Sequence, residues 1–194
     1  MADRSAFDTA TRIAAGDVGT DYDDVTVALH WATAILVAVL FLLGVTWDYF
    51  PKPTVGEMQS LHISLGVALT AVVVARIIWQ LLPGHHLPAI VGGWVKLASK
   101  GVHYLLYALL VLQAGLGWAW RWGQGHDVGF FGLFGIPGPY GALARPTRHL
   151  IGEVHEYVAW GIVIIAFAHA LAALYHHYKL HDRVLGRMLP AARG

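Results

Sequence analysis

The sequence predicts an all-α fold, a transmembrane four-helix up-down bundle. Of the 194 residues, 57% are hydrophobic and only 13% are charged, whereas a soluble domain has about 25% charged residues. Four separate segments are predominantly apolar over about 20 residues, which is the length of a helix that crosses a bilayer. Since lipid offers the backbone no hydrogen-bond partners, each of these segments must be helical.

The four segments are expected to form one transmembrane domain, residues 25–190, after a flexible cytoplasmic tail, residues 1–24. The tail is polar and acidic, and it lacks the apolar core of a cleavable signal peptide. The expected spans are residues 25–47, 58–82, 99–122 and 152–178.

Local signals mark the ends of the spans. Asp23 or Asp24 is placed to cap the first span. Pro83 closes the second span, and Gly123 and Gly125 break the third.

The connections between the spans differ in length. Residues 48–57 and 83–98 form short connections, so successive helices are expected to be antiparallel neighbours. The long connection, residues 123–151, is rich in glycine, proline and aromatic residues. We expect it to fold back over the mouth of the bundle at the membrane interface, where aromatic side chains are favoured.

Lysine and arginine are distributed unevenly over the two sides of the predicted bundle. Eight lie in the tail, the second connection and the C-terminus, and four lie on the opposite side. Because positively charged loops stay in the cytoplasm, both termini are expected to be cytoplasmic and the long connection periplasmic.

The residue types exclude several kinds of site. The chain has no cysteine, which excludes disulfides, iron–sulfur clusters, thiolate zinc sites and covalently attached c-type haem. The net charge of +1 is not the strong positive charge that is typical of nucleic-acid-binding proteins. Because the chain has twelve histidines and no cysteine, imidazole is the metal ligand for softer metal ions that it offers in quantity.

Seven of the twelve histidines lie in or at the ends of the spans: His30, His62, His103, His155, His169, His176 and His177. An ionisable side chain inside a membrane is costly and indicates a functional site. For any single histidine, an interhelical hydrogen bond explains its presence equally well.

The spacing of four of these histidines predicts two facing pairs. His155 and His169 are fourteen residues apart on the fourth span, which is roughly 21 Å along a helix and only about 40° around it. A histidine on another span matches each of them in depth. His62 lies level with His155 near the periplasm, and His30 lies level with His169 near the cytoplasm.

Two imidazoles from facing helices, without a thiolate, are typical ligands of a haem b iron that carries single electrons. Zinc prefers three or four ligands in a compact tetrahedron, which neither pair supplies. The sequence therefore predicts two haem b groups in the interior of the bundle. His62 and His155 would hold the iron of the outer haem, and His30 and His169 would hold the iron of the inner haem.

Arg76 and several glycines fit this prediction. Arg76 follows His62 by fourteen residues, and no carboxylate occurs in the cytoplasmic half of any span. A propionate of the inner haem would supply the anion that a buried guanidinium needs, while snorkelling towards the headgroups is the alternative. The spans also contain several glycines, which indicate either room for a planar group or close helix packing. They are Gly44, Gly66, Gly115, Gly117 and Gly161.

Two histidines at the cytoplasmic ends of spans are candidates for delivering protons. His176 lies seven residues after His169, about 20° away around the helix, and His103 begins the third span. A quinone near the inner haem would need such a proton donor. Anchoring of these side chains at the membrane interface is the simpler alternative.

Several motifs resemble those of one known family. HW in the first span, QSLHISLG in the second, VHYLLY in the third, and EVHEYVAW and AHALAALYHHYKLHD in the fourth are similar in order and spacing to the bacterial cytochrome b561 family. The resemblance covers residues 25–190. It implies a four-helix protein of the bacterial inner membrane with two haem b groups. The implied axial ligands are those that the spacing selects, His30, His62, His155 and His169.

Members of this family that are similar to the chain are described as superoxide oxidases, which pass electrons from periplasmic superoxide through two haems to ubiquinone. The resemblance implies that this chain is a superoxide:ubiquinone oxidoreductase. His103 and His176 would then protonate the quinone. The residues expected to steer superoxide to the outer haem are Arg121, Arg145 and Arg148. Because acidic residues on the periplasmic side equal the basic ones in number, a positively charged entrance is not evident from the sequence.

Two other functions stay open. The chain could be a non-catalytic cytochrome b subunit that relays electrons between a periplasmic oxidoreductase and the quinone pool. A histidine-based metal transporter would need acidic residues within the spans, where only Glu153 and Glu156 come close. Superoxide decay in the presence of the purified protein distinguishes an enzyme from a relay.

Overall fold

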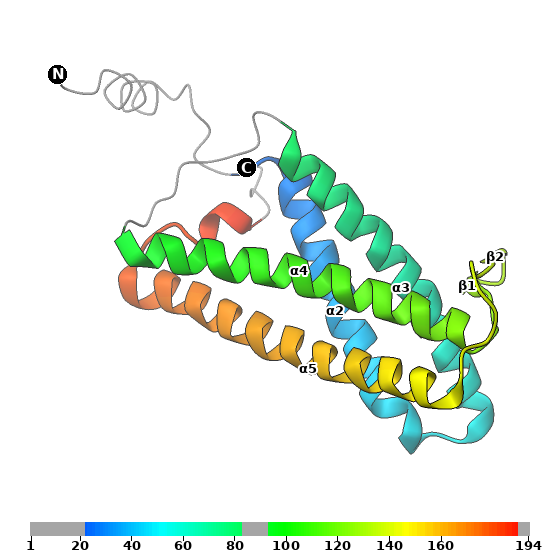
Figure 1. Ribbon diagram of the computed structural model, residues 1–194. Helices are drawn as coiled ribbons and strands as arrows, with labels where there is room; N and C mark the ends of the chain where they lie inside the picture. Colours follow the sequence, from blue (N-terminus) through cyan, green and yellow to red (C-terminus); the bar gives the residue numbers. More distant parts are fainter. Residues whose placement is uncertain (1–21, 83–92, 190–194) are drawn as a thin grey trace.

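The computed structural model describes residues 22–82 and 93–189 (Figure 1). Its four long helices are each long and apolar enough to cross a membrane. The predicted all-α transmembrane four-helix fold is therefore confirmed. Most of the expected tail, residues 1–24, and most of the connection at residues 83–98 lie outside the described residues.

The first helix, α2 (Asp24–Thr46), begins where the sequence predicts. Asp23 is its N-cap: the carboxylate accepts hydrogen bonds from the backbone N–H of Thr26 at 2.9 Å and from the Thr26 hydroxyl at 2.7 Å. This satisfies a donor that the first turn of a helix leaves without a partner. A short 3-10 turn, η1 (Trp47–Tyr49), follows α2.

The other three helices begin six or seven residues before the expected spans. They are α3 (Lys52–Leu81), α4 (Gly93–Gly123) and α5 (Arg145–Tyr175). Both α3 and α5 carry a proline in the first turn, where its missing N–H costs nothing. Hydropathy detects only the part of a helix that lies in lipid, and it therefore misses these polar first turns. The connection expected at residues 48–57 is correspondingly shorter.

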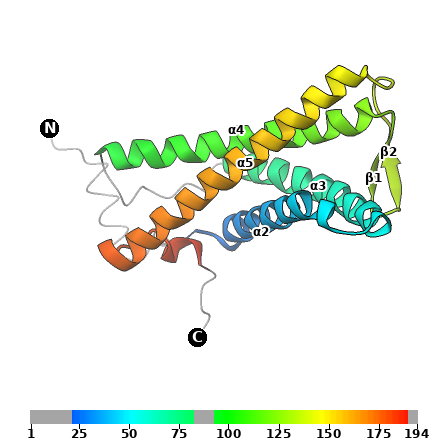
Figure 2. The ribbon, with the colours of Figure 1, turned by 90° about the horizontal axis from the view of Figure 1, so that it is seen from below.

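The helices form two antiparallel pairs. α2 packs mainly against α3, and α4 packs mainly against α5. Figure 1 shows α4 and α5 running side by side, and Figure 2 shows α5 crossing α4 obliquely. After α5 the chain continues through a π-helical turn, η2 (His176–Leu180), and a 3-10 turn, η3 (Gly186–Met188).

The buried core is a layer of aliphatic side chains in the middle of the helices. It consists of Leu40, Leu69, Val73, Leu110 and Ile162. Ile162 is seven residues from both His155 and His169, and Leu69 is seven residues after His62. Seven residues are about two turns of a helix, so the aliphatic layer lies between the two predicted histidine levels.

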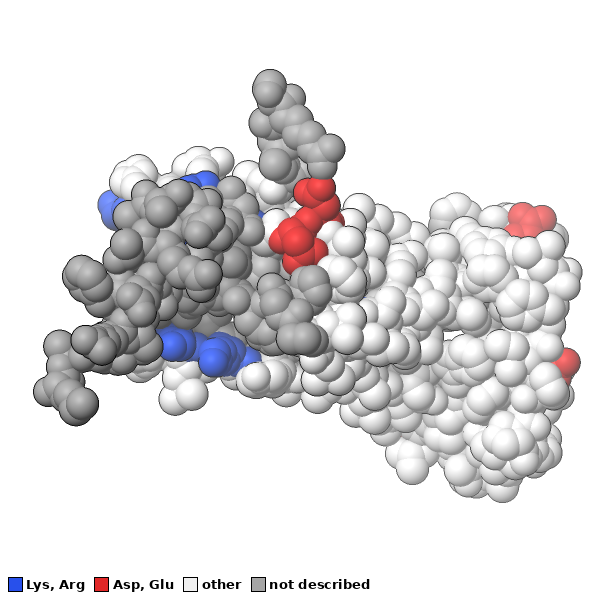
Figure 3. Space-filling view, turned by 90° about the horizontal axis from the view of Figure 1, so that it is seen from above, with Lys and Arg blue, Asp and Glu red and all other residues white. Residues whose placement is uncertain are grey.

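A broad band of the surface carries no charged side chain. On the face shown in Figure 3 this band separates an acidic cluster near the middle of the view from the acidic side chains at the end opposite to the lysines and arginines. This band is the surface that hydrocarbon would cover. Lysine and arginine gather at the end where α4 begins and α5 ends (Figure 3), which is the end that the loop charges assign to the cytoplasm.

The long connection contains a two-stranded antiparallel hairpin, β1 (Val128–Phe130) and β2 (Phe134–Ile136), which the sequence analysis did not predict. The hairpin lies over one end of the bundle (Figure 1). It is fixed to α3 because the backbone N–H of Phe131 donates to the buried Ser64 hydroxyl at 2.9 Å. The aromatic connection is thus held two residues from His62.

Candidate functional site

His62 of α3 and His155 of α5 face each other near the hairpin. Their ring centroids are 6.4 Å apart, with an angle of 70° between the ring planes. A metal–imidazole nitrogen bond is about 2 Å long and the ring centre lies roughly 1 Å beyond the nitrogen, so imidazoles on opposite sides of one ion have centroids about 6 Å apart. The two rings therefore have the spacing of two axial ligands of one metal ion.

The polar atoms around these rings also fit a bound metal. Nδ1 of His62 and Nδ1 of His155 are buried and have no hydrogen-bond partner among the described residues. Gln113 of α4 places its Nε2 3.1 Å from His155 Nε2, while its buried Oε1 has no partner in the described part of the chain. A buried polar group without a partner costs about 1–3 kcal/mol. A ligand that engages the imidazole nitrogens would reduce this cost.

Two of the predicted glycines lie directly against this pair. A Cβ atom at Gly117 would be 3.2 Å from Cε1 of His155, and a Cβ atom at Gly44 would be 3.7 Å from Cε1 of His62. By contrast, a Cβ atom at Gly115 would meet nothing within 4 Å. Gly44 and Gly117 therefore leave space for the imidazoles, which general helix packing does not explain.

Replacing Gly117 with valine is expected to displace His155 and to remove the haem that it would hold, because the new side chain would occupy the space of the imidazole. The ratio of haem to protein in the purified membrane protein measures this loss. Gly115→Val is the matched control on the same helix, and it should keep the haem content of the wild type. Equal haem content in both variants would show that Gly117 has no part in holding the imidazole.

A third histidine, His103, joins the predicted inner pair of His30 and His169, and the three form the inner group. His103 of α4 packs edge-on against His169 of α5, with ring centroids 4.9 Å apart, and its Nδ1–H donates to the Ser99 carbonyl at 2.7 Å. His30 of α2 is close enough to interact electrostatically with both rings. Within the described residues, no group of three or more histidine, cysteine or acidic side chains is placed to hold one metal ion. The arrangement therefore does not favour a compact zinc site.

Arg76 of α3 belongs to this inner group. Its Nη2–H donates to His30 Nδ1 at 2.9 Å, and its guanidinium carbon lies 5.1 Å from the centre of the Tyr107 ring. The side chain thus points into the bundle. Snorkelling towards the headgroups, the alternative considered above, does not describe it.

The two candidate proton donors occupy different places. His103 lies against His169 in the inner group. His176, in the π-helical turn after α5, instead places Nδ1 2.5 Å from a carboxylate oxygen of Asp182. This partner is not among the residues predicted from the sequence.

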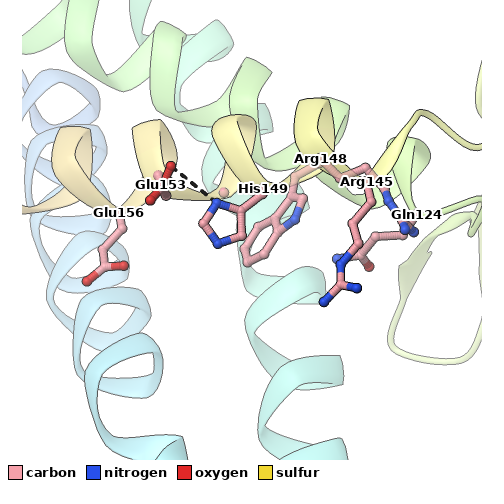
Figure 4. A pocket seen from close by; sticks show the side chains of 8 residues that line it. Gln124, Arg145, Arg148, His149, Glu153 and Glu156 are labelled. Carbon is pink, nitrogen blue, oxygen red and sulfur yellow. Dashed lines mark ion pairs between the residues drawn. The ribbon is translucent and has the colours of Figure 1, made fainter.

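A hollow of about 360 Å³ opens beside His155 at the hairpin end. Trp120 lines it, and the Trp120 ring centroid is 6.0 Å from that of His155. Figure 4 shows further lining side chains, which are Gln124, Arg145, Arg148, His149, Glu153 and Glu156. One tryptophan therefore connects the hollow to the predicted outer haem ligand.

The structure brings together two of the three arginines that were expected to steer superoxide. Arg145 and Arg148 line the hollow. Arg121 is not part of its wall, and its Nε–H donates to the Asp127 carbonyl at 3.2 Å. Arg121 therefore holds the long connection in place in this structure.

The hollow also contains negative charge. Glu153 and Glu156 line it beside the arginines, and Glu153 lies 3.3 Å from Nδ1 of His149 (Figure 4). Both members of this pair are more than half exposed, so the pair contributes little to stability. The carboxylates reduce the attraction that the hollow exerts on an anion.

Gln113 and Trp120 were not predicted as site residues. Gln113 had a usable signal, because an amide in the middle of an apolar span needs a polar partner. Trp120 had none, since the sequence does not give the rotation of α4 about its axis. Only the packing of α4 against α5 places Trp120 beside His155.

Comparison with known proteins adds independent information. The model of the prokaryotic cytochrome b561 family matches residues 21–191. Cytochrome b561 homolog 2 of Escherichia coli is 31% identical over 87% of this chain and 90% of its own length. A protein of Yersinia pestis named probable superoxide oxidase CybB is 30% identical over 89% of this chain and 98% of its own. Cytochrome b562 of Cereibacter sphaeroides is 29% identical over 87% of this chain and 94% of its own.

Proposed function

This chain belongs to the prokaryotic cytochrome b561 family, and on that premise we propose that it is a superoxide:ubiquinone oxidoreductase of the bacterial inner membrane. As a family member it is a multi-pass membrane protein of electron transfer, and the family implies haem b as its cofactor. The proposal adds superoxide as the electron donor, ubiquinone as the acceptor, two haems, and cytoplasmic termini.

Haem b between paired histidines would supply one-electron transfer. His62 and His155 would hold an outer haem, as supported by their 6.4 Å ring separation and their buried nitrogens. His30 and His169 would hold an inner haem, with Arg76 beside them. Fourteen residues of α5 separate His155 from His169, or roughly 21 Å along the helix.

The observation that carries the choice of superoxide is the hollow beside His155. Superoxide is a small anion, and Arg145 and Arg148 offer it positive charge in the wall of the hollow. Trp120, which belongs to the same wall, lies against the ring of His155. Loss of one electron converts superoxide to dioxygen without a proton or a nucleophile, so this end of the protein needs only attraction and access. Two superoxide ions and two protons convert one ubiquinone to ubiquinol.

Stopped-flow measurement of superoxide decay tests the proposal. Haem-loaded protein in vesicles with ubiquinone is expected to consume superoxide faster than free haem does. Arg145→Gln with Arg148→Gln should slow the decay several-fold, and more strongly at low ionic strength, because salt screens the attraction. The matched control, Glu153→Gln with Glu156→Gln, should speed it. Decay no faster than with free haem would contradict the enzyme and favour the non-catalytic relay.

A further inference from the structure

His176 and Asp182 form a hydrogen-bonded pair after the end of α5. Nδ1 of His176 lies 2.5 Å from Oδ2 of Asp182, and the two side chains are only 18% and 22% exposed. The backbone N–H of Val184 donates to the other carboxylate oxygen, Oδ1, at 3.0 Å. Both oxygens of Asp182 are therefore engaged, one by the imidazole and one by the backbone.

A continuous α-helix would keep these two residues apart. Residues six apart lie about 9 Å along an α-helix and about 240° around it. Here the chain widens into the π-helical η2, and His181 adopts a left-handed conformation with a φ of 52°. The N–H groups of His181 and Asp182 both donate to the His176 carbonyl. A left-handed conformation costs a residue other than glycine about 1–2 kcal/mol. The change of chain direction at His181, which brings Asp182 to His176, therefore has to be stabilised by other contacts of this segment.

His176 lies on the face of α5 and η2 that points into the molecule. Along this face the less exposed residues recur every three or four positions, at His169, Ala173 and His176. The next residue, His177, is exposed. His176 therefore continues the stripe that carries His169, and His177 does not.

The segment that follows Asp182 returns to α2. The indole N–H of Trp31 donates to the Met188 carbonyl at 2.7 Å, and Trp31 directly follows His30. The chain thus passes from His176 through Asp182 to the neighbour of an inner histidine. This places the pair at the inner end of the bundle.

We propose that Asp182 is a positioning residue that holds the His176 imidazole so that its Nε2 delivers a proton to ubiquinone as it is reduced. This inference rests on the quinone end of the proposed function. Because the carboxylate engages Nδ1–H, Nε2 is the ring nitrogen left for a substrate. In the transfer, the Nε2–H bond breaks and an O–H bond forms on the quinone oxygen. The electrons come from the superoxide oxidised at the other end, and water on the cytoplasmic side returns the proton to His176.

The charge of Asp182 suits this role. Burial raises the pKa of Asp182, but it is outweighed by the hydrogen bonds from His176 and the Val184 N–H together with the electrostatic attraction of His176 and His177, so that the pKa lies below its usual value. The carboxylate is therefore ionised at neutral pH, and it would lose its charge only as the pH falls through this lowered pKa. An ionised carboxylate keeps the proton on Nδ1 and stabilises a positively charged imidazole.

Asp182→Asn separates this role from a merely structural one. Asparagine can still accept the Val184 N–H with its Oδ1, and its NH₂ group then faces His176 Nδ1. The ring must accept at Nδ1 and carry its proton on Nε2, which is the opposite neutral tautomer. Nitrogen-15 NMR of the haem-loaded protein, labelled at histidine, should show this change of tautomer at His176 in Asp182→Asn. In the control variant His177→Gln, the His176 tautomer should be that of the wild type.

The rate of quinone reduction gives a second readout. We would reduce the haem-loaded protein chemically, mix it with a short-chain ubiquinone and follow its reoxidation. In Asp182→Asn the rate at saturating quinone should fall roughly 100-fold, as expected for loss of a general acid, while the half-saturating quinone concentration stays unchanged. His176→Gln should behave similarly, and His177→Gln should match the wild type.

The outcomes distinguish the inference from the proposed function. A wild-type tautomer and a wild-type rate in Asp182→Asn would show that Asp182 only shapes the turn, and the inference would be wrong. A wild-type protein that does not reduce ubiquinone would overturn both the quinone end of the proposed function and this inference. Quinone reduction without superoxide oxidation would overturn only the choice of superoxide as donor.

Discussion

Replacing His155 with alanine is expected to remove the outer haem and leave the inner one in place, so that the haem content of the purified protein falls by about half. His155 lies opposite His62 at 6.4 Å between ring centroids and is separated from the inner histidines by the aliphatic layer around Ile162. Loss of one of the two histidines that would hold the outer haem should therefore affect that haem alone. The haem-to-protein ratio and the reduced-minus-oxidised spectrum measure the effect.

Two further variants make this result decisive. His169→Ala should lose the inner haem and keep the outer one, so the two spectra should be complementary. His126→Ala, at an exposed histidine in the long connection, should keep both haems. If His155→Ala and His169→Ala lose the same spectral component, the pairing of ligands proposed here is wrong.

The sequence was sufficient for the main features because they depend on helix periodicity. Apolar length alone predicts the four helices, and a fourteen-residue spacing alone predicts that His155 and His169 share a face of α5. The depth of His62 follows from the antiparallel order of the spans. The observed separation of His62 and His155 agrees with this reasoning.

The remaining features depend on tertiary packing or on departures from a regular helix. Trp120 reaches His155 only through the rotation of α4 against α5. The third member of the inner group, His103, also depends on that rotation, since helix periodicity cannot relate residues on different helices. Asp182 meets His176 because the α-helix gives way to a π-helical turn, and no periodicity in the sequence predicts that change. Hydropathy likewise could not predict the hairpin, whose position depends on the hydrogen bond to Ser64.

Replacing Arg76 with glutamine is expected to lower the reduction potential of the inner haem and leave that of the outer haem unchanged. In the structure Arg76 donates to His30 Nδ1 at 2.9 Å. Because arginine only donates, this nitrogen accepts, and the neutral ring carries its proton on Nε2. A metal ligand must instead present a lone pair at its binding nitrogen. If His30 binds iron through Nε2, its proton moves to Nδ1 and Arg76 can no longer donate there.

The guanidinium then needs an anion. Apart from Asp24 in the first turn of α2, no aspartate or glutamate occurs in the cytoplasmic half of the four long helices, so a haem propionate is the anion that the proposed site would supply. Without Arg76, the inner haem loses a nearby positive charge that favours its reduced form. At an effective dielectric constant of about 20 and a distance of about 10–15 Å, one charge contributes about 1–2 kcal/mol, or roughly 40–90 mV for one electron.

A redox titration that resolves the two haems measures this shift. Arg76→Lys keeps the charge and should keep most of the potential, whereas Arg76→Gln keeps a hydrogen-bond donor but loses the charge. The comparison therefore isolates the effect of the charge. An unchanged inner potential in Arg76→Gln would show that Arg76 has no electrostatic effect on the inner haem. A shift of the outer potential instead would contradict the placement of Arg76 beside the inner haem. It would be unexpected because His62, the proposed ligand of the outer haem, lies fourteen residues earlier on the same helix.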